Sequence, residues 1–444
     1  MKSVKRSVLI MCDSLRRDLI NSSNSPVLSK LINEACWFSN ARGVFPSTTR
    51  VSSASIATGC LPARHGLLGN TMILPEAHGL RCRSVGNPDF REHMRRATGQ
   101  TLTAPTLAQR VAKYGGACIM SNVSAGAAYF HDPDGYGDVY HRAGSYGPGN
   151  RPYTGAEAME IPQGAPGDIE MTARFCQRLL GPDAPVISTL WLSEPDHTGH
   201  ATALGSPQHQ DAIRHANQCV EQVLDAVAML RRRGEDILLM VASDHGMETV
   251  IGEIDVGRAL VQAGLKAAAD SSDVVIAPNG SACILAVAPE AQDRTAAIGE
   301  YLDAQPWVGS TYAGDQLSDL GLPINNPGCT LAIAMRHSMQ PNKHGVAGST
   351  WIASDPEKNT SYQGQGQHGG LGVNEQSPFL IVQGGHYTAG STVSQPVQLI
   401  NFAPTMLRHL GLPFDDMDGT PLPFPYSGES AQIAAIHAYT DPES

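Results

Sequence analysis

The 444-residue sequence lacks several features that would assign it to other classes of protein at once. It has no run of about 18 apolar residues, so we predict no membrane span. The apolar run at 8–11 is too short for the core of a signal peptide and an acid follows it, so we expect no leader. The nine cysteines form no CxxC pair, which favours free thiols and a cytoplasmic location over a disulfide framework.

Positive charge is also scarce, because 31 lysines and arginines stand against 42 acids and give a formal net charge of −11. An acidic protein has no general attraction for nucleic-acid polymers or for anionic membranes, so we expect neither as a partner. A site that handles phosphate must then gain its positive charge locally, and bound metal ions are the obvious source. The sequence shows no internal repeat and no low-complexity tract.

What the sequence does contain is an alternation of buried strands and helices. Apolar runs at 7–11, 117–120, 186–192 and 237–242 are typical of buried strands, and 208–233 carries an apolar stripe at helical spacing. This order predicts an α/β fold with a mostly parallel central sheet sandwiched by helices. Ligands in such folds bind beyond the carboxyl ends of the strands.

The pattern changes in the middle of the chain, where shorter β-like runs accompany a helical segment at 291–304. We interpret this part as a small inserted α+β domain. The predicted division is a first part of the α/β core at 1–248, an inserted cap domain at 249–351 and the C-terminal part of the core at 352–444.

Acidic and imidazole side chains follow several of the predicted strands. Asp196 and His200 are four residues apart, a spacing that one helical turn brings to one side. Each signal alone has an ordinary structural interpretation, such as a helix cap or a turn, and their order on one α/β frame is what indicates a site. The set is Asp13, Asp196, His200, Asp244, His245 and His368. Carboxylates and imidazoles without cysteine suit zinc, manganese or similar divalent ions.

Thr49 stands before a run of small residues at 50–58 that could form a buried helix. Its structural interpretation is a helix N-cap. Its functional interpretation is a nucleophile at a helix start that gathers anionic oxygens, with a metal lowering the pKa of the hydroxyl. These residues alone leave both interpretations open.

Longer motifs resemble the nucleotide pyrophosphatase/phosphodiesterase (type I phosphodiesterase) branch of the alkaline-phosphatase superfamily. They are Phe45-Pro-Ser-Thr-Thr, Thr58-Gly, Leu61-Pro-Ala-Arg-His-Gly-Leu-Leu-Gly-Asn, Asp196-His-Thr-Gly-His, Ser243-Asp-His-Gly-Met and Gln367-His-Gly-Gly. The resemblance runs in order from residue 8 to about residue 420. It implies an alkaline-phosphatase-like fold.

The resemblance also implies roles for individual residues. Two divalent ions are expected, with zinc favoured and manganese as the alternative. One ion would be held by Asp13, Thr49, Asp244 and His245, and the other by Asp196, His200 and His368. Asn70 would bind a phosphoryl oxygen, and the alignment favours Thr49 over Thr48 as the nucleophile.

The implied activity is hydrolysis of small phosphodiesters or nucleotide-type pyrophosphates through a phosphothreonine intermediate. The partner would be a small phosphate- or phosphonate-containing substrate. A homodimer is compatible with this interpretation. A phosphomonoesterase and a phosphonate hydrolase are alternatives. The sequence is also similar to phosphonoacetate hydrolase. Members of that group carry a pattern similar to Thr-Ala-Lys-x-Lys, whereas the corresponding stretch 120–126 here has no lysine. A non-catalytic homologue is disfavoured because all metal-linked positions are present.

Overall fold

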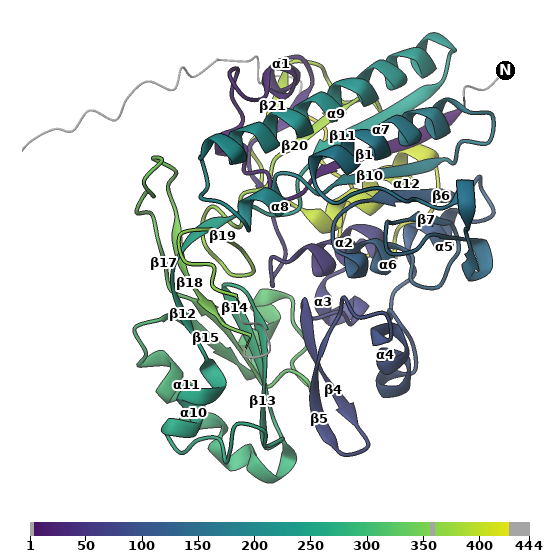
Figure 1. Ribbon diagram of the computed structural model, residues 1–444. Coiled ribbons are helices and arrows are strands. Elements are labelled where there is room, and N and C mark those ends of the chain that lie inside the picture. Colours follow the sequence, from purple (N-terminus) through teal and green to yellow (C-terminus); the bar gives the residue numbers. More distant parts are fainter. Residues whose placement is uncertain (1–3, 356–359, 426–444) are drawn as a thin grey trace, which may run out of the picture.

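The computed structural model describes residues 4–355 and 360–425 (Figure 1). Its largest element is a central ten-stranded sheet. In order across the sheet, the strands are β21 (Ser391–Val393), β2 (Cys36–Phe38), β20 (Leu380–Gln383), β11 (Asp236–Ala242), β1 (Lys5–Cys12), β10 (Ile187–Leu192), β6 (Ala117–Ser121), β7 (Asp138–Tyr140), β8 (Tyr146–Gly147) and β9 (Arg151–Pro152). The strands from β11 to β7 run parallel, and β20 pairs antiparallel with β11.

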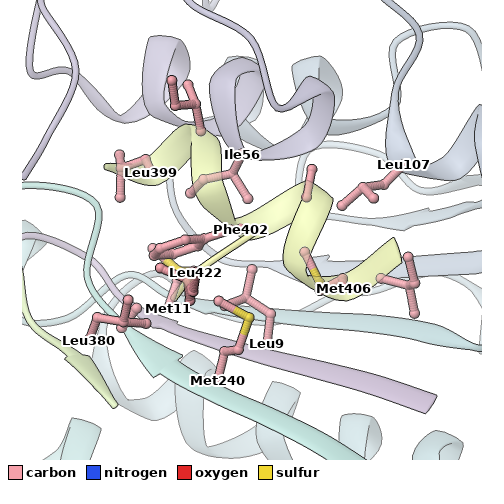
Figure 2. Packing of buried hydrophobic residues seen from close by; sticks show 14 of the residues in the cluster. Leu9, Met11, Ile56, Leu107, Met240, Leu380, Leu399, Phe402, Met406 and Leu422 are labelled. Carbon is pink, nitrogen blue, oxygen red and sulfur yellow. The ribbon is translucent and has the colours of Figure 1, made fainter. Parts of the chain in front are cut away.

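Alternate residues of the central strands enter two separate cores, as the two-residue period of a strand requires. Leu9 and Met11 belong to one core, whereas Val8 and Ile10 belong to the other. Figure 2 shows the first core, where Phe402 packs over Leu9 and Met11. Both faces of the sheet are therefore covered, which explains why its strands read as continuous apolar runs.

Helices lie on both faces of the central sheet (Figure 1). The helices of one face are α1 (Pro26–Glu34), α7 (Ala165–Leu180) and α9 (Pro207–Arg232). The other face carries α2 (Thr49–Thr58), α5 (Leu107–Val111), α6 (Ala125–His131) and α12 (Phe402–Leu410). The remaining helices are α3 (Pro62–His65), α4 (Phe90–Thr98), α8 (Asp196–Gly199), α10 (Val256–Gln262) and α11 (Thr295–Asp303). Among the described residues, no helix has both the length and the apolar character needed to cross a membrane.

Two four-stranded sheets lie beyond the carboxyl edge of the central sheet. One consists of β17 (His337–Ser338), β18 (Ser349–Ala353), β12 (Glu248–Ile254) and β19 (Gly366–Gln367). The other consists of β13 (Val274–Asn279), β14 (Ala282–Val287), β16 (Leu331–Met335) and β15 (Val308–Ala313). A hairpin of β4 (Thr71–Glu76) and β5 (Gly79–Ser84) shares an apolar core with the second sheet (Figure 1). The remaining short strands are β3 (Ala41–Arg42) and β22 (Val397–Gln398).

The predicted fold class is confirmed, and the predicted strands and long helices are present within a few residues. The helical segment predicted at 291–304 is shorter than expected, because residues 289–294 form a 3₁₀ helix and α11 spans Thr295–Asp303. The hairpin β4–β5 was missed, because its sequence contains a proline and alternates weakly. The division into three segments stays a prediction, although the hairpin shows that residues 71–84 pack with the segment 249–351.

Candidate metal centre

Three neighbouring parallel strands deliver the carboxylates of the candidate site. Asp13 follows β1 directly, Asp244 comes two residues after β11, and Asp196 follows β10 by way of the turn 193–195. Because β11, β1 and β10 are adjacent and parallel, their carboxyl ends meet at one edge of the sheet. The three acids that the sequence separates by up to 231 positions are thereby brought together, as predicted from their places after strands.

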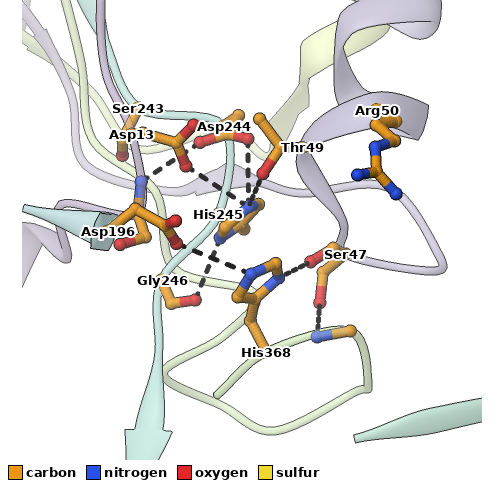
Figure 3. A network of polar contacts seen from close by, with 12 residues as sticks. Asp13, Ser47, Thr49, Arg50, Asp196, Ser243, Asp244, His245, Gly246 and His368 are labelled. Atoms are coloured by element: carbon orange, nitrogen blue, oxygen red, sulfur yellow. Dashed lines mark hydrogen bonds and ion pairs between the residues drawn. The ribbon is translucent and has the colours of Figure 1, made fainter. Parts of the chain in front are cut away.

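His245 lies at the centre of the deeper part of the site (Figure 3). Its Nε2 atom is 3.0 Å from Asp244 Oδ2 and 3.6 Å from Asp13 Oδ1. The hydroxyl oxygen of Thr49 lies 3.2 Å from the same Nε2 atom. These four side chains are the ones expected to hold the first metal ion, and all four are buried.

The second group is more open to solvent. Asp196 Oδ1 lies 3.4 Å from His200 Nε2 and 3.5 Å from His368 Nε2. The short helix α8 begins at Asp196, and His200 is its C-cap with helical backbone angles, so one helical turn brings the two side chains to one side. The side chains of Asp196 and His200 are 18% and 27% exposed, whereas that of His245 is fully buried.

Backbone carbonyls fix the protonation of all three histidines. The Nδ1 atoms of His200, His245 and His368 lie 3.1, 3.1 and 2.7 Å from the carbonyl oxygens of Gly366, Gly246 and Ser47. A carbonyl oxygen only accepts, so Nδ1 carries the proton and donates in each case. In the neutral form of each ring, the Nε2 atom that faces the carboxylates then carries a lone pair, which is the tautomer of a metal-ligating histidine.

The residues present fit a divalent cation. Within the described ranges, Asp13 Oδ1, Asp196 Oδ1 and Asp244 Oδ2 accept no hydrogen bond although each is buried. Each of these oxygens instead faces an imidazole Nε2 atom at 3.0–3.6 Å. Acceptors that face acceptors in a buried site repel one another unless a cation lies between them. An oxygen and nitrogen donor set without thiolates suits zinc or manganese.

The ligand atoms form two overlapping groups in which every atom lies within 4.8 Å of the others. One group is Asp196, His200 and His368, as expected for the second ion. The other is Asp13, Asp196 and His245, so Asp196 lies between the two groups. This position of Asp196 was not foreseen from the sequence, where it was assigned to one ion alone.

The electrostatics of the site follow from burial and from the crowding of acids. Burial, with the charges of Asp244 and Asp196, raises the pKa of Asp13 well above its usual range. Burial alone would lower the pKa of His245, but the charge and hydrogen bond of Asp244, the charge of Asp196 and the contact with the Gly246 carbonyl together outweigh this effect, so the pKa is raised. Burial and the nearby His245 hold the pKa of His368 well below its ordinary value. The deeper group is thus a place where positive charge is strongly favoured.

Thr49 is the first residue of α2, and Thr48 is its N-cap. The Thr48 side chain makes no capping hydrogen bond, so no side chain satisfies the first amide groups of this helix. The structural interpretation of Thr49 as the cap therefore does not apply, since Thr48 holds that position.

Asn70 lies in a cavity of about 270 Å³ that His200 and His368 also line. Its backbone N–H donates to Asn279 Oδ1 at 2.6 Å, and its side-chain oxygen has no partner among the described residues. Asn70 therefore lines the same cavity as His200 and His368 of the more exposed ligand group. The side chain of Asn70 therefore keeps hydrogen-bonding capacity for a ligand.

Several supporting residues were not found from the sequence. Trp191 Nε1 donates to Asp13 Oδ2 at 3.1 Å, and the backbone N–H of Ser14 donates to Asp244 Oδ1 at 3.2 Å. The carbonyl of Ser47 orients His368. Such partners lie far away in the sequence or act through the backbone, so no motif marks them. His65 and His197 lie outside both ligand groups, and His65 instead shares a buried hydrogen bond with Ser55.

Comparisons with known proteins agree with this geometry. Human ectonucleotide pyrophosphatase/phosphodiesterase family member 1 is 25% identical over 254 residues, which are 54% of this chain and 23% of the relative. The rat protein of that name is 26% identical over 255 residues, 54% of this chain and 24% of the relative. The match thus spans about a quarter of the length of these curated relatives.

A solved structure shares the fold. Murine ectonucleotide pyrophosphatase/phosphodiesterase 5, an inactive variant in complex with AMP, superposes with a TM-score of 0.66 at 16% sequence identity. The similarity covers 95% of this chain and 97% of that chain. The type I phosphodiesterase / nucleotide pyrophosphatase family model matches residues 7–315, which confirms the predicted resemblance. The chain therefore belongs to the type I phosphodiesterase / nucleotide pyrophosphatase family, whose members are hydrolases of phosphoric ester bonds.

Proposed function

We propose that the chain is a two-metal phosphoesterase that hydrolyses small phosphodiesters or nucleotide-type pyrophosphates. One observation carries the proposal: buried carboxylate oxygens without partners face the Nε2 atoms of three histidines, beside the hydroxyl of Thr49. Divalent ions held by the two ligand groups would lower the pKa of that hydroxyl and neutralise charge on the leaving oxygen. We propose zinc for both groups, with manganese as the alternative.

The chain's own residues would carry the covalent chemistry. The Thr49 oxygen attacks phosphorus, the bond from phosphorus to the leaving oxygen breaks, and a phosphothreonine forms. A water oxygen then attacks phosphorus, the bond to the Thr49 oxygen breaks, and the hydroxyl regains its proton. Asn70 and the open amides at the start of α2 donate to the phosphoryl oxygens on which charge grows.

The proposed substrate class has three supports. The family is one of phosphodiesterases and nucleotide pyrophosphatases, and the structural neighbour was solved in complex with AMP. The cavity beside the ligand groups, at about 270 Å³, suits a small molecule better than a polymer. A cytoplasmic location and a homodimer stay predictions.

Thr49 and its neighbour Thr48 offer a matched pair for the test. Initial rates would be measured for the metal-loaded protein on a chromogenic phosphodiester, a phosphomonoester and a phosphonate monoester. We expect the highest kcat/KM on the diester and a loss of at least about 10⁴-fold in Thr49→Ala, because the nucleophile is removed. Thr48→Ala should keep measurable turnover.

A second readout identifies the intermediate. Acid quenching during turnover, followed by mass spectrometry, should find a phosphoryl group on Thr49 in the wild type and in Thr48→Ala. A highest rate on the monoester would keep the mechanism and reject the substrate class. Full turnover in Thr49→Ala would reject the mechanism itself.

A further inference from the structure

Arg50 follows Thr49 on α2, and its positively charged guanidinium forms no ion pair with an acidic side chain in the described part of the chain. Its Nε atom donates to Ser124 Oγ at 3.2 Å, and its Nη1 atom donates to the carbonyl oxygen of Asn70 at 2.8 Å. Across residues 4–355 and 360–425, Nη2 has no hydrogen-bond acceptor and no carboxylate forms an ion pair with this guanidinium. Figure 3 shows Arg50 on the helix beside Thr49, outside the network of dashed contacts.

The position of the guanidinium is built into the fold. A Cβ atom at Gly86 would lie 2.5 Å from Nη2, and one at Gly126 would lie 2.8 Å from Nε. Real Cβ atoms do not approach so closely, and neither glycine has a positive φ that would explain it otherwise. The two glycines therefore leave room for the arginine, and the two hydrogen bonds fix its orientation.

The arginine lines the same cavity as the candidate metal ligands. Thr48, Asn70, His200 and His368 share the cavity with Arg50. Thr48 Oγ1 and Asn70 Oδ1 are buried there without partners among the described residues, whereas Arg50 is half-buried. Three unused polar atoms thus converge on a space of about 270 Å³ beside Thr49. Unused polar atoms in a cavity are the usual mark of a ligand position.

The rest of the cavity wall does not neutralise this charge. Glu253 and Asp355 also line the cavity. The Oε1 atom of Glu253 accepts hydrogen bonds from Ser361 Oγ and the backbone N–H of Tyr362, and Asp355 has an interaction of its own. Burial lowers the pKa of Arg50 to about 10, so the guanidinium stays charged at neutral pH. A buried cation without a counter-charge is unfavourable, and an incoming anion would offset that cost.

We propose that Arg50 is a specificity-determining residue that donates from Nη2 to a second anionic oxygen of the substrate, next to the phosphoryl group that Thr49 attacks. This inference rests on the proposed function. Within the proposed substrate class, Arg50 would favour molecules that carry two negative charges close together, such as nucleotide-type pyrophosphates. The second charge can lie on the reacting phosphorus, as in a phosphomonoester, or on the leaving group, as in a pyrophosphate. A phosphodiester with one charge gains nothing from Arg50.

The test compares charge variants on substrates of different charge. Arg50→Met removes the charge, and Arg50→Lys keeps the charge but lacks the planar guanidinium with its several N–H donors. Arg42→Met is the matched control, because Arg42 is exposed on β3 and contacts Asn40. Rates would be measured on bis(4-nitrophenyl) phosphate, 4-nitrophenyl phosphate and a dinucleoside pyrophosphate. We expect Arg50→Met to lower kcat/KM about 10- to 100-fold on a doubly charged substrate and less than about 3-fold on the diester.

The pattern of losses identifies where the second charge lies. A loss confined to the monoester assigns it to the reacting phosphorus, and a loss confined to the pyrophosphate assigns it to the leaving group; both support the inference. Arg50→Lys should recover part of the loss, and Arg42→Met should behave as the wild type. Equal losses on all three substrates, or no loss on any, would overturn the inference.

A binding measurement keeps this inference separate from the proposed function. Inorganic phosphate would be titrated into the metal-loaded wild type and variants by calorimetry. We expect a dissociation constant about 10-fold or more weaker in Arg50→Met and an intermediate value in Arg50→Lys. If the wild type hydrolysed none of the substrates, the proposed function would fail, while an unchanged phosphate affinity in both Arg50 variants would reject the role of Arg50.

Discussion

Two clusters of buried carboxylates lie beyond the carboxyl edge of the central sheet, and they differ in what surrounds them. Asp13, Asp196 and Asp244 face imidazole Nε2 atoms. Glu248 and Glu375 instead accept hydrogen bonds from backbone and neutral side chains, and neither belongs to a group of three potential metal ligands in the described part of the chain.

The difference shows two ways in which a fold can compensate the charge of neighbouring carboxylates. Glu375 Oε2 accepts from Ser281 Oγ and the backbone N–H of Gly370, both at 2.7 Å, and its other oxygen has no partner. Burial and the neighbouring Glu248 raise the pKa of Glu375 to about 8. A proton on Glu375 therefore reduces the charge of this pair at neutral pH, whereas we propose that a metal cation balances the charge of the aspartates beside the histidines.

The largest expected effect comes from removing the metals. A chelator should abolish turnover and lower Tm, because each site contributes about 4 kcal/mol of stability when the metal exceeds its Kd a thousandfold. Added Zn²⁺ should restore both quantities. Calorimetric scans and rate assays would measure this, and full turnover after chelation would contradict the assignment of the aspartate cluster.

Asp13→Asn should change stability in opposite directions with and without metal. In the metal-free protein, the substitution removes one of three mutually repelling buried carboxylates and keeps an acceptor for Trp191, so Tm should rise at pH 8. In metal-loaded protein, a ligand is lost and Tm should fall. Thermal scans in chelator and in excess zinc would test this, and a change of the same sign in both conditions would argue against it.

Glu375→Gln should alter the pH dependence of stability whether or not metal is present. Because the folded pKa of about 8 lies above the usual 4.5, this carboxyl's contribution is complete below about pH 4.5 and is lost as pH rises through 8. The glutamine has no such dependence, so the wild type should lose stability relative to the variant between pH 5.5 and 8.5 (both values flank the shifted pKa). Parallel Tm curves would contradict the protonated state of Glu375. The other charged groups that face this pair are His245, and His337 and Arg16 next to Glu248.

The smallest expected effect comes from an acid outside both clusters. Asp255 is the N-cap of α10, and its side chain accepts from the backbone N–H of Arg258 at 2.9 Å. Asp255→Ala should cost about 1 kcal/mol of stability and leave metal content and pH dependence unchanged. Denaturant unfolding would measure the cost, and a change in metal content would show that the contrast between clusters is not local.

Only part of the contrast between these clusters could be predicted from the sequence. Asp196 and His200 could be paired from spacing, and Asp13 and Asp244 from their places after buried strands, because strand order and helical period are local signals. The partners of Glu375 and of His368 could not be found in this way. His368 donates to the carbonyl of Ser47 across 321 positions, and a backbone contact at that distance leaves no pattern in the residue types.

The same reason explains what was missed in the fold. The apolar periods of the central strands and of α9 predicted those elements well, since burial on both faces or on one stripe determines residue type. The hairpin β4–β5 is stabilised by packing on β13 and β14, a contact between segments about 200 positions apart. Arg50 looked like an ordinary residue on a small-residue helix, because the glycines that accommodate it lie elsewhere in the chain.

The most direct test of the account is a count of bound metal after dialysis against zinc, by mass spectrometry of the metal and by anomalous diffraction. The wild type should hold two ions per chain, one near Asp13, Asp244 and His245 and one near His200 and His368. His368→Ala should retain one ion, and Glu375→Gln should retain two. A wild-type protein that binds no more than one ion per chain would contradict the two-metal centre.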